Sequence, residues 1–351
     1  MERGFSLFLG NSGYRTDQTQ YIRRMSEARF TFVFTSLHIP EEDAALYVER
    51  LDQLVREAHR CGLRVIVDVS PSSLPYVASL DESVDGLRLD YGFSAEAIME
   101  LAKTYQIAFN ASTLTETFLH ELVNQGLSLK NVEAWHNYYP RPETGLSLEW
   151  IKRRNQWLHT QGLKTVAFVS GDGQRRGPLY RGLPTAEAHR EVSPYGAARD
   201  LHDRLHTDAI VIGDQDLSPY SLMTFRENEA RLRVSVREDI QEAELALLQL
   251  PHRQRFDPAR DVIRSETSRP YARKGEFAIR AKETQTPSSR LKGTVTIDNE
   301  TYGRYEGELQ IMKKELPFDE KVNVVANVRE EDMILLDILR PGEPFRLVTD
   351  E

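Results

Sequence analysis

This chain has a single cysteine, no long apolar run and no concentrated basic segment. Cys61 has no partner for an intramolecular disulfide, and its place before Gly62 at the end of a helical pattern is typical of a packing residue. No apolar stretch approaches the roughly 18 residues that span a bilayer, which argues against a membrane protein. The opening Met-Glu-Arg-Gly lacks the apolar region of a signal peptide, so we expect a cytoplasmic protein with no membrane partner.

The formal net charge is -9, and Lys and Arg are not clustered into a run. Nucleic-acid binding depends on clustered basic side chains that neutralise phosphates, so we expect no nucleic acid as partner, although a small basic pocket for one phosphate stays compatible with this charge. Hydrophobic residues make up 40% and charged residues 28% of the 351 residues. This composition predicts a folded protein with one large domain and one smaller domain, and it leaves a homodimer open.

Nucleotide and zinc motifs are missing from the sequence. No Gly-x-Gly-x-x-Gly follows the first expected strand, Gly10-Asn-Ser-Gly13 is too short for a dinucleotide site, and no Gly-x-x-x-x-Gly-Lys loop occurs. Closely spaced His or Cys ligands are lacking too. We therefore expect no cofactor and no metal, with a hard-cation site built from Asp and Glu as the competing interpretation.

Short apolar runs alternate with amphipathic segments over the first 230 or so residues, which predicts parallel strands joined by helices. Eight such pairs favour a (β/α)8 TIM-type barrel over residues 1–235, with an open Rossmann-like sheet carrying extra elements as the alternative. The expected strands cover residues 5–10, 31–37, 64–70, 86–91, 107–112, 131–136, 164–170 and 208–213.

The pattern changes after about Arg237. Short β-rich runs at 294–297, 305–312, 323–328 and 345–348 are separated by Gly, Pro and charged turns. We therefore predict that residues 236–351 form a second, mostly β domain.

Polar side chains stand at the ends of the expected barrel strands, where they would face a common pocket. They are mostly carboxylates and amides: Asp68, Asp90, Asn110, Glu133 and Asp214. Several inward carboxylates suit glycoside hydrolysis, in which one acid protonates the leaving oxygen and a second serves as nucleophile or as base for water. From position we select Asp90 and Glu133 as the catalytic pair, with Asp68 as third candidate and Trp135 as an apolar wall for Glu133. The alternative for each Asp is a helix cap or an ion pair with a neighbouring Arg.

The segment 131–147 concentrates donors, acids and aromatic faces, which is typical of a ligand-binding loop. Its expected substrate contacts are His136, Asn137, Tyr139, Arg141, Glu143 and Thr144. The alternative is an aromatic loop that only closes one end of the domain. A second loop carries Arg175, Arg176 and Arg181. We expect Arg181 to contact the substrate, and the alternative is that these arginines are only solvated surface charge.

Three segments resemble the bacterial 6-phospho-N-acetylmuramidases. They are His136-Asn-Tyr-Tyr-Pro-Arg-Pro-Glu-Thr-Gly-Leu146, Gly177-Pro-Leu-Tyr-Arg-Gly-Leu-Pro184 and Thr267-Ser-Arg-Pro-Tyr-Ala-Arg273. The resemblance covers nearly the whole chain and implies an N-terminal barrel followed by a small cyclophilin-like domain. It also implies an intracellular, exo-acting glycosidase of peptidoglycan recycling that cleaves the disaccharide of 6-phospho-N-acetylmuramic acid and N-acetylglucosamine.

A phosphorylated amino-sugar disaccharide requires fixed cationic donors, and guanidinium groups match phosphate geometry. We expect Arg264, Arg269 and Arg273 to bind the phosphate, and the alternative is that they only hold the two domains together. Two further functions stay open. A non-catalytic sugar-phosphate sensor would use the same loop, whereas an aldolase or isomerase would usually need a strand-end lysine or a metal, and no lysine stands at such a place.

Overall fold

The computed structural model describes residues 1–349 except 11–14, 16, 38–43, 81, 275–277 and 283–287. It divides into two compact units, Met1–Glu227 and Asn228–Glu351. We had placed the boundary at 235/236. The division lies earlier because Ala230–Val236 is a strand of the second unit, paired with two other strands of that unit.

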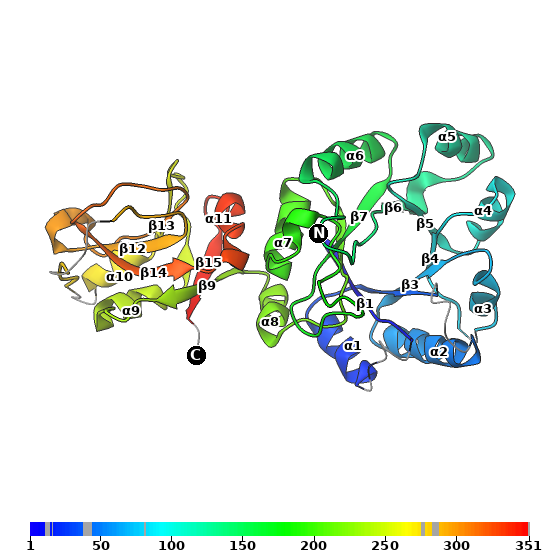
Figure 1. Cartoon of the computed structure of the whole chain (residues 1–351), viewed down its shortest axis with the longest axis horizontal. Coiled ribbons are helices and arrows are strands. Elements are labelled where there is room, and N and C mark those ends of the chain that lie inside the picture. The colour runs from blue at the N-terminus through cyan, green and yellow to red at the C-terminus, as the bar shows by residue number, and fades with distance from the viewer. Residues whose placement is uncertain are drawn as a thin grey trace. The chain divides into compact units, whose positions relative to one another are not determined.

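The described part of the first unit forms a closed barrel of eight parallel strands with helices around it (Figure 1). This confirms the predicted TIM-type fold. The strands are β1 (Glu2–Ser6), β2 (Phe32–Ser36), β3 (Arg64–Val69), β4 (Gly86–Leu89), β5 (Gln106–Asn110), β6 (Val132–Trp135), β7 (Lys164–Val169) and β8 (Ala209–Ile212). The first strand begins earlier than residue 5 because Glu2 already pairs with Ala209 of β8.

The helices follow the strands in order. They are α1 (Gln18–Glu27), α2 (Ala44–Arg60), α3 (Leu74–Ala78), α4 (Ala95–Leu101), α5 (Glu116–Asn124), α6 (Leu148–Thr160), α7 (Pro194–Asp203) and α8 (Pro219–Glu227), with short 3-10 helices at Leu129–Asn131 and Glu187–His189. Ser94, Thr115 and Ser147 begin α4, α5 and α6, and each side-chain oxygen accepts a main-chain N–H three residues on. These caps satisfy donors that the first helical turn leaves unpaired. Among the described residues, no helix is long and apolar enough to cross a membrane.

Alternate residues of each strand point into the barrel, and aromatic side chains fill its centre. Phe34, Trp135 and Phe168 meet with ring centroids 5.2–6.0 Å apart, and Phe32, Ile66, Val166 and Val211 pack around them. This layer separates the polar side chains at the two ends of the barrel. The position of an inward residue along its strand therefore determines at which end of the barrel its side chain lies.

The described part of the second unit is a seven-stranded sheet in the order β10-β15-β9-β14-β12-β13-β11. Its strands are β9 (Ala230–Val236), β10 (His252–Arg253), β11 (Val262–Arg264), β12 (Thr294–Asp298), β13 (Leu309–Met312), β14 (Val322–Val328) and β15 (Pro344–Thr349). Its helices are α9 (Glu242–Leu248), α10 (Ser268–Lys274) and α11 (Leu335–Ile338), with 3-10 helices at Glu300–Tyr305 and Glu330–Asp332. The predicted mostly β second domain is confirmed.

Candidate active site

A pocket of about 280 Å³ opens at the carboxyl ends of the barrel strands. This is the end at which TIM barrels place their active sites. Its walls combine carboxylates, guanidinium groups and aromatic rings: Phe34, Ser36, Asp68, Arg88, Asp90, Asn137, Tyr138, Phe168 and Arg176.

Asp68 and Arg88 form the polar centre of this pocket. They are direct partners across β3 and β4, so the strand register itself brings them together. Arg88 Nη1 donates to Asp68 Oδ1 at 2.7 Å, and Ser36 Oγ donates to Asp68 Oδ2 at 3.2 Å. Arg88 Nη2 also donates to Asn137 Oδ1. Because Arg88 is only 5% exposed, its charge requires these acceptors, and the network fixes the Asp68 carboxylate.

Asp90 stands two residues beyond Arg88 and therefore on the same inward side of the chain. Its main-chain N–H donates to Val69 O at 3.0 Å, which continues the β3–β4 pairing past the last residue of β4. Asp90 lines the main pocket and an adjoining one of about 150 Å³, which Asn110 also lines. The pocket thus contains two carboxylates, Asp68 and Asp90, as we had expected from their strand-end positions.

Arg176 reaches the pocket from the loop that follows β7. Its Nη1 donates to Tyr138 Oη at 3.2 Å, and its guanidinium lies 3.6 Å from the centroid of the Phe8 ring. Within the described part of the chain, no carboxylate lies within ion-pair distance of this guanidinium. Among the described residues, Arg176 therefore adds an unpaired positive charge to the pocket lining.

Asp214 holds the loop that carries Arg176. Its carboxylate accepts main-chain N–H groups from Gly171, Arg176 and Leu183 at 2.9–3.0 Å. Burial raises the pKa of Asp214, and the three donors act in the opposite direction. Asp214 is fully buried and does not line the pocket, so the predicted substrate contact is instead a support for Arg176.

Glu133 does not join Asp68 and Asp90. It is the second residue of β6, and its carboxylate accepts a hydrogen bond of 2.8 Å from Trp135 Nε1. Its other polar neighbours, Arg64, Glu2 and Gln106, begin their strands, so Glu133 lies at the amino end of the barrel beneath the aromatic layer. Burial raises the pKa of its carboxyl, but at the end opposite the pocket, and Trp135, which we had expected to form an apolar wall, donates a hydrogen bond that lowers this pKa. We correct the proposed Asp90–Glu133 pair accordingly.

His136 also lies outside the pocket, because inward residues of β6 alternate and Glu133, Trp135 and Asn137 take the inner positions. Its Nε2 is 2.7 Å from Asn155 Oδ1 of α6, and its ring meets that of Trp150. The side chain is fully buried, and burial lowers the pKa of His136 to about 4. We therefore correct its predicted role from substrate contact to neutral packing residue.

Beyond Tyr138, which lines the pocket, the loop is held through its backbone. Glu143 and Gly145 donate N–H groups to Glu187, and Arg190 donates to the main-chain oxygens of Tyr139 and Arg141. The Arg190 side chain is the main factor that lowers the pKa of Glu187 to about 2. The predicted contacts Tyr139, Arg141, Glu143 and Thr144 do not line the pocket, whereas Asn137 does.

Three further predicted arginines, Arg181, Arg264 and Arg269, have carboxylate partners. Arg181 is exposed and lies 3.9 Å from Glu191. In the second unit, Arg264 binds the buried Glu308 through two hydrogen bonds of 2.6 and 3.1 Å, and Arg269 lies 3.4 Å from the same carboxylate. The side chain of Arg273 lies outside the described residues.

Six pocket residues were not among the predicted site residues: Phe34, Ser36, Arg88, Tyr138, Phe168 and Arg176. The alternation in Leu87-Arg88-Leu89-Asp90 places Arg88 and Asp90 on one face of the strand, and Arg176 belongs to the loop in which we had selected Arg181 as the substrate contact. Among the described residues, no group of three or more His, Cys, Asp or Glu side chains could hold a metal ion.

Two family models match this chain, and together they span both units. Residues 3–227 match the model described as 6-phospho-N-acetylmuramidase, N-terminal, and residues 230–348 match its C-terminal counterpart. The chain belongs to the 6-phospho-N-acetylmuramidase family. The two matched segments meet at residues 227–230, where the structure also divides.

Solved structures of similar proteins agree with this membership. A crystal structure of a conserved Enterococcus faecalis protein of unknown function is 38% identical, covers 100% of this chain and 97% of its own, and superposes with a TM-score of 0.88. An uncharacterised B. cereus protein is 26% identical, with 99% of both chains covered and a TM-score of 0.73. A comparison with curated proteins gave no match.

Proposed function

We propose that this protein hydrolyses the glycosidic bond between 6-phospho-N-acetylmuramic acid and N-acetylglucosamine, acting on the chain end during intracellular peptidoglycan recycling. The observation that carries the proposal is one pocket at the carboxyl end of the barrel that contains two carboxylates, Asp68 and Asp90, together with Arg176, a guanidinium that has no carboxylate partner among the described residues. Family membership supports the reaction class.

Asp90 is the proposed acid that protonates the leaving oxygen. Asp68 is the proposed second carboxylate, which acts on the sugar carbon or on a water molecule. The Arg88 guanidinium compensates the negative charge of Asp68, and Ser36 orients its second oxygen. Tyr138 and Phe168, whose ring centroids lie 5.2 Å apart, offer aromatic surface for the sugar.

We assign the 6-phosphate to Arg176. A guanidinium binds phosphate through parallel N–H groups, and that of Arg176 faces the pocket with no carboxylate among the described residues to compete. Arg264 and Arg269, our choice from the sequence, already share Glu308. A phosphate bound there would have to displace the Glu308 carboxylate or share the two guanidinium groups with it.

The test is incubation of the pure protein, with a chelator present, with the phosphorylated and the unphosphorylated disaccharide. We expect release of N-acetylglucosamine from the phosphorylated substrate only. Release from neither, with binding still measurable, would support a sugar-phosphate sensor instead. Release in a parallel incubation without chelator, but not in its presence, would support the hard-cation alternative.

A further inference from the structure

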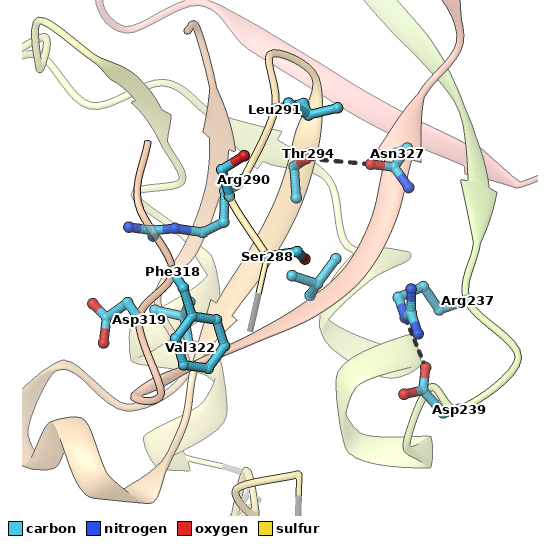
Figure 2. A pocket seen from close by; sticks show the side chains of 12 residues that line it. Arg237, Asp239, Ser288, Arg290, Leu291, Thr294, Phe318, Asp319, Val322 and Asn327 are labelled. Atoms are coloured by element: carbon cyan, nitrogen blue, oxygen red, sulfur yellow. Dashed lines mark hydrogen bonds and ion pairs between the residues drawn. The ribbon is translucent and has the colours of Figure 1, made fainter. Parts of the chain in front are cut away.

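The second unit contains a pocket of its own, of about 380 Å³ (Figure 2). Its floor comes from strands β12 and β14 through Thr294, Val322 and Val324. Arg290 and Phe318 stand on one side of it, and Arg237 with Asp239 stands on the other, as Figure 2 shows. All residues that line this pocket belong to the second unit, and none of them lines the barrel pocket.

One wall of this pocket is apolar and suits the face of a small ring. Phe318 is 38% exposed, and Figure 2 shows its ring beside Val322. Leu291, at 59% exposure, stands at another side of the pocket. Exposed aromatic and aliphatic side chains lining a pocket are the usual surface against which the carbon face of a sugar packs.

Hydrogen-bonding groups complete the lining. Thr294 Oγ1 donates to Asn327 Oδ1 at 3.3 Å, which leaves the Asn327 Nδ2 group able to donate to a ligand. Asp239 accepts from Arg237 Nε at 3.0 Å and keeps acceptor capacity for hydroxyl groups. A pocket with one apolar wall and several short polar side chains matches a hydroxylated ring better than a lipid or an extended apolar peptide.

Arg290 supplies a positive charge to this pocket, which two carboxylates, Asp239 and Asp319, also line. Its backbone pairs with Leu316 in both directions, and its Nε donates to Pro317 O at 2.9 Å, so the base of the guanidinium is fixed. Among the described residues, its two Nη groups have no hydrogen bond and no carboxylate within ion-pair distance. Two parallel donors on a fixed guanidinium match the geometry of a phosphate.

We infer that this pocket is a second ligand site, which binds a monosaccharide phosphate. Arg290 holds the phosphate, Phe318 packs against the ring, and Asn327 and Asp239 bind hydroxyl groups. This site would exist whether or not the barrel hydrolyses the proposed disaccharide. It would allow the second unit to sense a phosphorylated sugar independently of the barrel.

The test is calorimetric titration of the full chain with glucose 6-phosphate, compared with glucose and inorganic phosphate. We expect saturable binding of the sugar phosphate that weakens about 10-fold or more in Arg290→Ala, since a charged hydrogen-bonding group is lost. Phe318→Ala should weaken binding of the sugar phosphate but not that of inorganic phosphate. Arg260→Ala is the matched control, because Arg260 belongs to the same unit, is 86% exposed at its side chain and lies outside the pocket.

Arg176→Ala separates this site from the barrel pocket: the binding of glucose 6-phosphate that is lost in Arg290→Ala should persist in Arg176→Ala. Loss of binding in Arg176→Ala with full binding in Arg290→Ala would place the ligand in the barrel and overturn the inference. So would an absence of saturable binding up to about 5 mM sugar phosphate. Arg290→Lys guards against misfolding of the alanine variant, because it keeps the charge and should retain part of the affinity.

Discussion

Arg88 Nη1 donates a 2.7 Å hydrogen bond to Asp68 Oδ1, and the two residues are register partners on neighbouring barrel strands. The pair is nearly buried, with side-chain exposures of 6% and 13%. A buried ion pair is expensive to break from one side, because the remaining charge loses its partner without regaining water. The geometry of the proposed second carboxylate and the stability of the barrel therefore depend on the same contact.

Arg88→Ala should lower the free energy of unfolding by about 3–5 kcal/mol, since it leaves the Asp68 charge buried without its partner. Denaturant unfolding of the full chain measures this. Arg153→Ala is the control, because Arg153 forms an exposed helical pair with Glu149 at 3.5 Å and should cost about 0.5 kcal/mol or less. Combining Arg88→Met with Asp68→Leu should recover much of the loss. Equal, small effects of Arg88→Ala and Arg153→Ala would contradict a buried pair.

Arg176→Ala should raise KM for the phosphorylated disaccharide by about 10- to 100-fold with a smaller effect on kcat, because a charged contact to the phosphate is lost. Steady-state kinetics with varied substrate measures both. Arg181→Ala provides the comparison from the same loop. The Arg181 side chain is 57% exposed, so this substitution should leave KM and kcat unchanged. An unchanged KM in Arg176→Ala would move the phosphate elsewhere, with Arg264 and Arg269 as the next residues to replace.

Asp298 should make the second unit less stable as the pH rises. Burial raises its pKa, assisted by the charges of Glu308 and Asp319, from 3.8 to about 7. Between these two values the folded state keeps a proton that the unfolded state has released, so stability falls with rising pH across this window and is constant above it. The penalty above pH 7 is on the order of 2–4 kcal/mol.

Asp298→Asn removes this charge while keeping the shape of the side chain. Thermal unfolding measured from pH 4 to pH 8 should show the variant gaining stability over the wild type as pH increases. Asp257→Asn is a suitable control, because that carboxylate is largely exposed, at 67%, beside Arg255. Parallel curves for wild type and Asp298→Asn would show that the Asp298 carboxyl ionises without penalty in the folded protein.

Much of the fold could be predicted from the sequence because the relevant signals are local. The strand and helix periodicities repeat eight times, and Ser94, Thr115 and Ser147 cap their helices through hydrogen bonds to main-chain groups only three residues on. The same local logic placed Asp68 and Asp90 in one pocket, since both stand at the carboxyl end of their strands.

The failures have a common cause, which is that side-chain direction and depth depend on distant elements. Glu133 is early in its strand, and only the neighbouring Arg64 and Glu2 reveal that it serves the opposite end of the barrel. His136 faces Asn155, 19 residues on, and Arg264 binds Glu308, 44 residues on. No spacing within the sequence predicts such partners.

The measurement that tests the proposed active site most directly is turnover of the phosphorylated disaccharide by Asp90→Asn and Glu133→Gln side by side. Both substitutions remove one acidic group and keep the side-chain shape, but only Asp90 lines the pocket at the carboxyl end of the barrel. We expect Asp90→Asn to lower kcat by about 100-fold or more, as loss of a general acid does, and Glu133→Gln to keep kcat within a few-fold. An active Asp90→Asn and an inactive but folded Glu133→Gln would contradict this assignment.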